Sequence, residues 1–157
     1  MFNFFKKKKN DSNIYSPCKG VLKPVEEVKD EVFSSKAMGE GFAVKPKDGA
    51  IFSPVNGEVM SVFPTKHALG IKTIDGTEVL VHVGLNTVEL EGKPFTMLVE
   101  EGAMVNQNTQ LLEVDLEMIA QAGKGDDIIV VFPGAKNVPK LDVVGEVSAG
   151  VIIGSIK

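Results

Sequence analysis

Apolar residues along this chain fall into short runs that Gly and Pro interrupt at intervals of roughly ten residues. The runs are rich in Val, Ile, Leu, Phe and Thr, which suit a pleated, half-buried surface. Many short strands separated by turn residues are typical of a sandwich or barrel. The pattern therefore predicts an all-β fold of antiparallel strands.

The clearest element is a β-hairpin. Residues 70–74 and 77–83 read as two strands, and Asp75-Gly76 lies between them. Asp-Gly is a favoured pair for a two-residue type I′ turn, because both central residues of that turn need positive φ. On the second strand alternate side chains point to opposite faces, so His82 should lie on the face opposite three valines, Val79, Val81 and Val83.

This hairpin also brings together the only two histidines of the chain, His67 and His82. A turn centred between Asp75 and Gly76 places Leu69 opposite His82, with His67 two residues further along the same strand. Alternation then puts Leu69 and His67 on the same face as His82. Diagonal neighbours on one face lie about 7–8 Å apart, so we expect the two imidazole rings to approach each other.

A helix is expected only around residues 115–122. Asp115 can cap its first turn, and Gly123 can end it. An apolar stripe of helical spacing lies between them: Leu116, Met118 and Ile119. We therefore expect one or two short helices in a fold made mainly of strands.

The sequence contains a short motif that occurs twice, and this repeat is called the echo below. Residues 14–20 read Ile-Tyr-Ser-Pro-Cys-Lys-Gly and residues 51–57 read Ile-Phe-Ser-Pro-Val-Asn-Gly. Two copies are too few for a solenoid, which needs at least about three repeats. The echo favours a pseudo-symmetric sandwich built from a repeated β unit.

Composition narrows the class of protein. The chain has 157 residues, of which 43% are hydrophobic and 24% charged, as expected for one globular domain. No apolar run reaches the roughly 18 residues of a membrane-spanning helix. Cys18 is the one cysteine, so an internal disulfide is excluded and a reducing cytoplasm fits. All 17 basic residues are lysines, which removes bidentate arginine contacts to phosphate or guanine and argues against a nucleic-acid partner.

The basic residues are unevenly distributed. Residues 1–10 read MFNFFKKKKN and carry four lysines, while the other 13 lysines face 21 acidic residues, a net charge of −8. We expect residues 1–12 to form a flexible basic and aromatic tail ahead of a single domain at 13–157. This tail is either simply solvated, or residues 2–9 make a weak contact with anionic lipid, with the rings in the interface and the lysines at the headgroups. The expected location is cytoplasmic, or membrane-peripheral if that contact forms.

Two imidazoles on one exposed patch are compatible with several roles. A neutral imidazole can accept a phosphoryl group while the second donates a hydrogen bond to it. With a carboxylate the pair can instead hold a catalytic zinc, although the sequence has neither an HExxH motif nor a third histidine. Each histidine can also be a plain strand residue. The sequence contains no P-loop and no GxSxG motif.

Segment 64–90, PTKHALGIKTIDGTEVLVHVGLNTVEL, closely resembles the active-site region of the glucose-type enzyme IIA of the bacterial phosphoenolpyruvate-dependent sugar phosphotransferase system. It contains both histidine motifs. The resemblance covers about residues 13–157, since it continues through Ser16–Gly20, Val32-Phe33, Gly39–Gly41, Ser53–Gly57, Glu100–Gly102 and Val114–Leu116.

The resemblance implies an antiparallel β-sandwich or barrel-like fold of the duplicated hybrid-motif type. It also implies a relay in which phosphohistidine HPr donates a phosphoryl group and a cysteine of a sugar-specific IIB domain accepts it. His82 would be phosphorylated through Nε2, with Nδ1 bonded to the carbonyl of Gly84. His67 would stabilise the phosphoryl group, and Thr65 would support His67. Carriage would need no cofactor, while a zinc ion shared with a partner would bind at His67 and His82 in a complex.

The resemblance also places an apolar docking patch around the site. Asp30 would lie on its rim, and core packing is the alternative for each apolar member: Val32, Phe33, Met38, Phe63, Leu69 and Leu80. Asn86 departs from the family pattern, since many relatives carry Asp there. A neutral side chain at this position would remove one repulsion from the phosphoryl group and one attraction for a basic partner.

A second function on the same fold is a regulatory binding module. Its phosphorylation state would control transporters or metabolic enzymes such as kinases. This alternative and the carrier role share the same site residues, so the sequence does not separate them.

Overall fold

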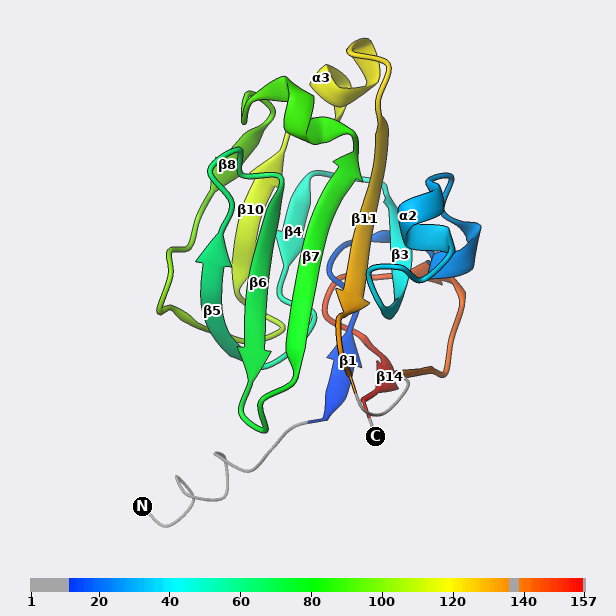
Figure 1. Ribbon diagram of the computed structural model, residues 1–157, viewed down its shortest axis with the longest axis vertical. Coiled ribbons are helices and arrows are strands. Elements are labelled where there is room, and N and C mark those ends of the chain that lie inside the picture. Colours follow the sequence, from blue (N-terminus) through cyan, green and yellow to red (C-terminus); the bar gives the residue numbers. More distant parts are fainter. Residues whose placement is uncertain (1–11, 136–138, 157) are drawn as a thin grey trace.

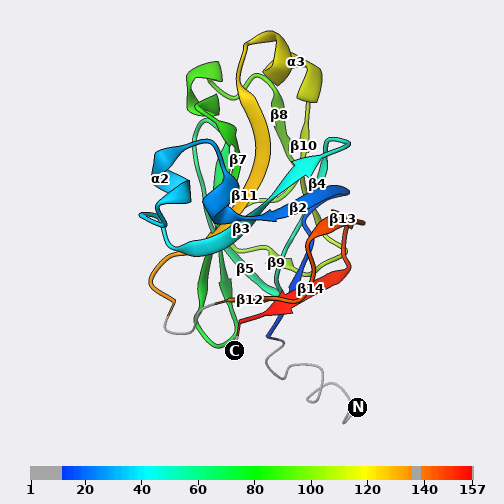
Figure 2. The ribbon, with the colours of Figure 1, turned by 90° about the vertical axis from the view of Figure 1, so that its right-hand side faces the viewer.

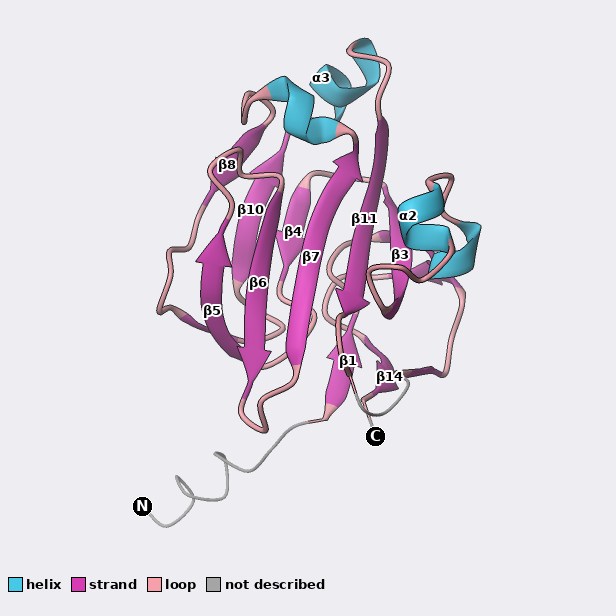
Figure 3. Ribbon diagram, in the orientation of Figure 1, coloured by secondary structure: helices cyan, strands magenta, loops and turns pink. Residues whose placement is uncertain are grey.

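The computed structural model describes residues 12–135 and 139–156 (Figure 1). Strands dominate these residues and the helices are short (Figure 3), so the predicted all-β class is confirmed. The strands are β1 (Asn13–Tyr15), β2 (Gly20–Pro24), β3 (Glu40–Pro46), β4 (Ala50–Phe52), β5 (Gly57–Val62), β6 (Ala68–Thr73), β7 (Glu78–Leu85), β8 (Phe95–Met97), β9 (Met104–Val105), β10 (Gln110–Val114), β11 (Gly125–Phe132), β12 (Lys140–Leu141), β13 (Gly145–Val147) and β14 (Ile152–Ser155). The helical segments are η1 (Val25–Glu27), α2 (Glu31–Ser34), η2 (Thr87–Leu90) and α3 (Leu116–Gln121).

The strands form an antiparallel sandwich. One sheet has eight strands in the order β13-β2-β3-β11-β7-β6-β5-β9, and two three-stranded sheets have the orders β1-β14-β12 and β4-β10-β8. Figures 1 and 2 show β4, β8 and β10 as a second layer behind β5, β6 and β7. The main core cluster joins residues of both layers, such as Ile51 and Leu112 with Val81 and Val130. The other face of the large sheet carries a second, smaller apolar cluster.

The repeated motif forms the centre of a pseudo-symmetric pair. Tyr15 N donates to the Pro54 carbonyl at 2.8 Å, and Phe52 N donates to the Pro17 carbonyl at 2.6 Å. In both copies the serine hydroxyl donates to the carbonyl two residues further on. The strand order of the large sheet divides likewise into β13-β2-β3-β11 and β9-β5-β6-β7. The pseudo-symmetry predicted from the echo is therefore present.

The hairpin turn differs from the predicted one. Gly76 N donates to the Thr73 carbonyl at 2.9 Å and Thr73 N donates to the Thr77 carbonyl at 2.9 Å, so the loop has three residues, 74–76. Only Gly76 takes positive φ, +92°. A type I turn followed by a left-handed glycine satisfies the strand twist without left-handed backbone at Asp75. The Asp75 carboxylate also accepts a hydrogen bond from Thr77 N, 3.3 Å away. The predicted two-residue type I′ turn is therefore wrong, because the loop has three residues and only the last has positive φ.

The longer loop shifts the strand register by one residue. Ala68, and not Leu69, lies opposite His82, while Leu69 lies opposite Val81 on the core face. Leu69 is completely buried in the main core. Its predicted place in the docking patch is therefore wrong, because a one-residue slip moves a side chain to the other face of the sheet.

The two α-helices both begin at a capping aspartate. Asp115 Oδ1 accepts from Met118 N at 3.0 Å and starts α3, which ends just before Gly123 at φ +73°. This confirms the helix predicted around 115–122. Asp30 Oδ1 accepts from Val32 N at 2.9 Å and starts α2. With four residues α2 is too short to show helical periodicity in the sequence.

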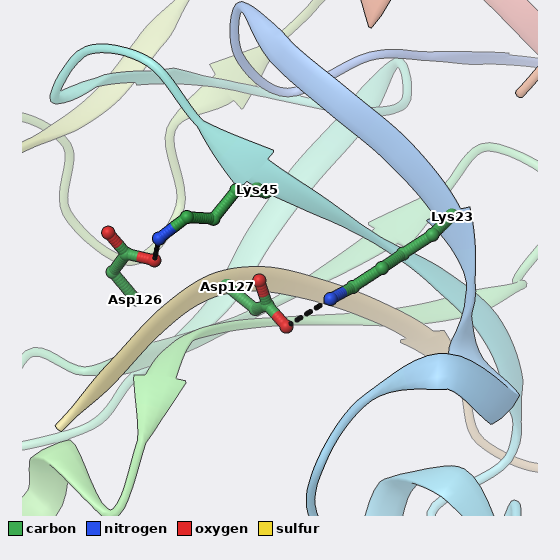
Figure 4. Close-up of polar contacts among 4 residues, drawn as sticks. All are labelled: Lys23, Lys45, Asp126 and Asp127. Carbon is green, nitrogen blue, oxygen red and sulfur yellow. Dashed lines mark hydrogen bonds and ion pairs between the residues drawn. The ribbon is translucent and has the colours of Figure 1, made fainter. Parts of the chain in front are cut away.

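Two ion pairs tie the start of β11 to its neighbours (Figure 4). Lys23 Nζ lies 2.9 Å from Asp127 Oδ2, and Lys45 Nζ lies 2.5 Å from Asp126 Oδ1. Asp127 is buried, and a buried carboxylate needs a charged or hydrogen-bonding partner. The pairs therefore join side chains of β2 and β3 to the start of β11.

Most of the N-terminal segment lies outside the described residues. The predicted tail lies outside the described residues except for Ser12, whose carbonyl accepts from Ile156 N at 2.9 Å. The lipid contact predicted for residues 2–9 lies outside them as well. Within the described ranges, no helix has the length and apolar character to cross a membrane.

Candidate functional site

The candidate site lies on the outer face of the large sheet. His82 on β7 stands between Ala68 on β6 and Ile129 on β11. Figure 2 shows α2 on this side of the sheet, away from β8 and β10. Under α2 and η1 lies a second apolar cluster: Val25, Val28, Phe33, Ala43, Ile129 and Val131, with Leu80 and Leu85 packed against it. The cluster gives His82 one apolar wall.

The two imidazole rings meet, as predicted. Their centroids are 5.0 Å apart and their planes are inclined by 82°. Phe33 lies against His82 at 4.9 Å, and Phe63 lies edge-on to His67 at 5.5 Å. His67 is buried to 7% exposure, while His82 is half-buried. The rings therefore form a compact pair framed by two phenylalanines.

Thr65 contacts the inner histidine. Its Oγ1 lies 2.5 Å from Nδ1 of His67. The turn that presents both residues is closed by Lys66 N, which donates to the Phe63 carbonyl at 2.8 Å with Lys66 at φ +60°. When the hydroxyl donates to Nδ1, the proton of neutral His67 lies on Nε2 and can be donated outward.

Gly84 approaches the other histidine. Nδ1 of His82 is buried and has no partner at full hydrogen-bond geometry among the residues described, yet the Gly84 backbone interacts with the ring and raises its pKa. The predicted Nδ1 to Gly84 bond is therefore a contact that falls short of a regular hydrogen bond. Gly84 has φ +82°, and a Cβ there would lie 2.8 Å from the Gly125 carbonyl oxygen. Only glycine fits this position.

The site keeps both histidines neutral near pH 7. Burial, and then the neighbouring His67, lower the pKa of His82 to about 4, against the opposing effects of Gly84 and Asp30. Burial also lowers the pKa of His67. An uncharged imidazole has a free lone pair on one ring nitrogen, so each ring can act as a nucleophile or as a single hydrogen-bond donor.

The predicted apolar patch is only partly exposed. Val32, Met38 and Phe63 are exposed at 52%, 36% and 38%, and Leu80 is half-buried. Phe33 lies on the buried side of α2, and its ring contacts His82. Three members therefore offer free apolar surface, and one of them, Phe63, lies directly against His67.

Of the two predicted polar positions, Asp30 acts on His82 and Asn86 begins the segment that follows β7. Asp30 is half-buried, and its charge opposes the fall in the pKa of His82. Asn86 is exposed and left-handed, with φ +60°, where η2 begins. Asn tolerates this conformation better than most residues, which gives a backbone reason for Asn at this position.

Part of the exposed surface on this side of the sheet was not predicted from the sequence. A groove of about 310 Å³ reaches Phe63, which contacts His67, and its lining also includes Met60, Lys72, Glu78 and Leu80. Val88 on η2 is also 48% exposed. Alternation along β5 places Met60 on the outer face, and this was the signal available from sequence.

Comparisons with known proteins agree on one family. Residues 12–138 match the family described as phosphoenolpyruvate-dependent sugar phosphotransferase system, EIIA 1. The glucose-specific EIIA component of Halalkalibacterium halodurans is 46% identical over 127 residues, covering 77% of this chain and 73% of that protein. The glucose permease IIA from Mycoplasma capricolum superposes with a TM-score of 0.84 at 37% identity, covering 92% of this chain and 95% of that one.

One relative is much longer than this chain. The glucose-specific EIICBA component of Streptococcus pneumoniae is 47% identical over 146 residues, which cover 92% of this chain. The chain spans only 20% of that relative's length. The matched region is therefore one part of a larger protein there.

Proposed function

The chain belongs to the EIIA 1 family of the phosphoenolpyruvate-dependent sugar phosphotransferase system, as a phosphocarrier component in sugar uptake, and we propose that His82 carries the phosphoryl group. In this proposal HPr is the donor and a cysteine of a sugar-specific IIB domain is the acceptor. The pairing of two neutral imidazoles at 5.0 Å carries the proposal.

Each transfer exchanges one bond to phosphorus for another. The Nε2 lone pair of His82 attacks the phosphorus of the donor phosphohistidine, and the electrons of the broken P–N bond return to the donor imidazole. In the second transfer the IIB thiolate attacks the same phosphorus, and the P–N bond of His82 breaks to restore its lone pair. A proton on Nδ1 of His82, facing Gly84, leaves Nε2 free for the first step.

His67 and Thr65 act on the transferring group. With the Thr65 hydroxyl donating to Nδ1, Nε2–H of His67 donates to a phosphoryl oxygen. The charge that builds up on these oxygens during transfer is stabilised best by a donor that is already oriented. The ring needs no movement to donate, because Thr65 and Phe63 hold it.

The exposed apolar residues exclude water during docking. Hydrolysis of the phosphohistidine would waste the donor, so two protein surfaces must cover the ring during transfer. Val32, Met38 and Phe63 offer apolar surface for that contact, with Asp30 as the nearby charge. Asn86 would weaken the attraction for a basic partner at its position.

The proposal needs no cofactor for phosphoryl carriage. Zinc usually has four ligands, and His67 and His82 are two suitable nitrogens. No cluster of three or more His, Cys, Asp or Glu residues that fits a metal occurs in the described part of the chain. We therefore propose that zinc binds at this pair only where a partner supplies further ligands.

A two-step assay tests the function. The chain is mixed with phosphoenolpyruvate, enzyme I and HPr, and its intact mass is measured before and after a IIB domain is added. We expect one phosphoryl adduct that disappears when IIB is present. An adduct that IIB never removes would favour the regulatory role over the carrier role. The absence of any adduct would reject both transfers.

A further inference from the structure

Thr87 lies five residues after His82, and its side chain is completely buried. Among the described residues 83–90 it is the only buried polar one. It is the first residue of η2, where a threonine would ordinarily face water. Its hydroxyl donates to the carbonyl of Val83, four residues earlier. The side chain therefore points back toward the histidine strand.

The Val83 carbonyl lies where the sheet ladder is irregular. β7 and β11 shift register between Gly125 and Ile128, beside Val83 and Gly84. Such a bulge interrupts the regular pairing of backbone groups, and buried carbonyls need a hydrogen-bond donor. The Thr87 hydroxyl supplies that donor to Val83.

The methyl group of Thr87 packs against Gly84, the residue that follows Val83. Gly84 has φ +82°, and a Cβ built there would overlap Cγ2 of Thr87. Thr87 therefore touches the backbone at Val83 through its hydroxyl and packs against Gly84 through its methyl. These two contacts restrain the peptide unit between Val83 and Gly84 and the Cα of Gly84.

The segment that bears Thr87 is held from outside as well. Lys124 Nζ lies 2.5 Å from Oε1 of Glu89, which joins η2 to the turn before β11. Asn86 and Glu91, at the two ends of η2, are left-handed at φ +60° and +56°. Such backbone persists only where surrounding contacts impose it.

We propose that Thr87 is a positioning residue for His82: by fixing the backbone around Gly84, it holds the Gly84 carbonyl toward Nδ1 of His82. The carbonyl then favours the ring tautomer with the proton on Nδ1 and the lone pair on Nε2. Thr87 touches neither the ring nor a transferred group, so it acts only through Gly84. The effect of Thr87 on phosphoryl transfer rests on the proposed function. Its effect on the tautomer of His82 does not.

The test uses three variants of the full chain. Thr87→Val keeps the shape and removes the hydroxyl, and Thr87→Ser keeps the hydroxyl and removes the methyl. Thr73→Val is the matched control, because Thr73 is also a buried threonine whose hydroxyl is hydrogen-bonded, but it lies at the hairpin turn. The tautomer of His82 is read from its ¹⁵N shifts at pH 7 without any phosphoryl donor, and transfer from HPr is measured separately.

We expect Thr87→Val to lower the fraction of His82 with its proton on Nδ1. Its kcat for phosphoryl acceptance should fall by about tenfold with little change in KM for HPr, since partners that orient an imidazole have effects of this order. Thr87→Ser should stay closer to the wild type, and Thr73→Val should change neither readout. If Thr87→Val does not fold, Thr87→Ala removes the hydroxyl and the methyl together, and the same fall in the Nδ1-protonated fraction is expected.

A folded Thr87→Val or Thr87→Ala protein with the wild-type tautomer and the wild-type rate would overturn the proposal. A shifted tautomer in a chain that accepts no phosphate would support the positioning role and reject the proposed function. The two failures are therefore distinguishable.

Discussion

The rings of His67 and His82 stand almost perpendicular, with centroids 5.0 Å apart. Neither ring carries a charge near pH 7, because burial lowers both pKa values. One ring can therefore act as the nucleophile while the other donates a hydrogen bond from a fixed direction.

His67→Gln should still accept a phosphoryl group from HPr but fail to pass it to IIB. The amide occupies a similar space and leaves the lone pair of His82 intact, but it loses the oriented Nε2–H donor. Single-turnover transfer to IIB measures the second step. Normal transfer by this variant would contradict the assigned role of His67.

Thr65→Val should reduce transfer without unfolding the protein. The hydroxyl at 2.5 Å from Nδ1 selects the tautomer of His67. Its loss should cost about 1 kcal/mol of stability, as for a typical hydrogen bond. The ¹⁵N shifts of His67 and the urea midpoint report the two effects separately, and Thr65→Ser should restore both.

Acid should destabilise the protein through His82. The pKa of His82 is about 4 in the folded state against its ordinary value of 6.5, so between these pH values the unfolded chain binds a proton that the folded chain does not. Its contribution to stability is complete above about pH 6.5 and is lost as the pH falls toward 4. We expect a loss of about 2 kcal/mol between pH 7 and pH 5 that is absent in His82→Gln. Urea unfolding at both pH values measures it, and equal pH dependence in the two proteins would argue against this assignment.

Gly84→Ala should be far more destabilising than Gly76→Ala. Both glycines have positive φ, but a Cβ at Gly84 meets Thr87 and the Gly125 carbonyl, whereas nothing lies within 4 Å at Gly76. Left-handed backbone alone costs alanine roughly 1–2 kcal/mol, and overpacking adds about 1–3 kcal/mol. Thermal unfolding compares the two variants. Similar melting temperatures would mean that the backbone at Gly84 relaxes freely.

Leu69→Ala and Phe63→Ala should separate stability from docking. Leu69 is fully buried in the main core, so its truncation should cost about 2–5 kcal/mol. Phe63 is 38% exposed beside His67, so its truncation should cost less stability but raise KM for HPr. Unfolding and transfer kinetics on both variants check this. If Leu69→Ala raised KM for HPr more than Phe63→Ala does, Leu69 would belong to the docking patch after all.

The sequence predicted the architecture better than the register. The Ser-Pro echo at residues 14–20 and 51–57 reflects a real pseudo-symmetry, because both copies serve the same backbone contacts. Asp75-Gly76, by contrast, fits a two-residue turn and also the end of a three-residue turn, and local residues do not distinguish them. The one-residue difference placed Leu69 on the wrong face, although both histidines still met.

Other features of the site have no local signal. Thr87 follows a strand like many exposed threonines, and its burial depends on the bulge between β7 and β11. Phe33 belongs to a helix of four residues, and its contact with His82 depends on where α2 docks. Such contacts arise from packing between segments distant in the sequence.

The most direct test of the account is to locate the phosphoryl group after incubation with phosphoenolpyruvate, enzyme I and HPr. Long-range ¹H–¹⁵N NMR of the phosphorylated chain identifies the modified ring nitrogen, and intact mass of His82→Ala shows whether any other residue accepts phosphate. We predict one phosphoryl group on Nε2 of His82 and no adduct on His82→Ala. A phosphoryl group on His67, or an adduct that persists on His82→Ala, would contradict it.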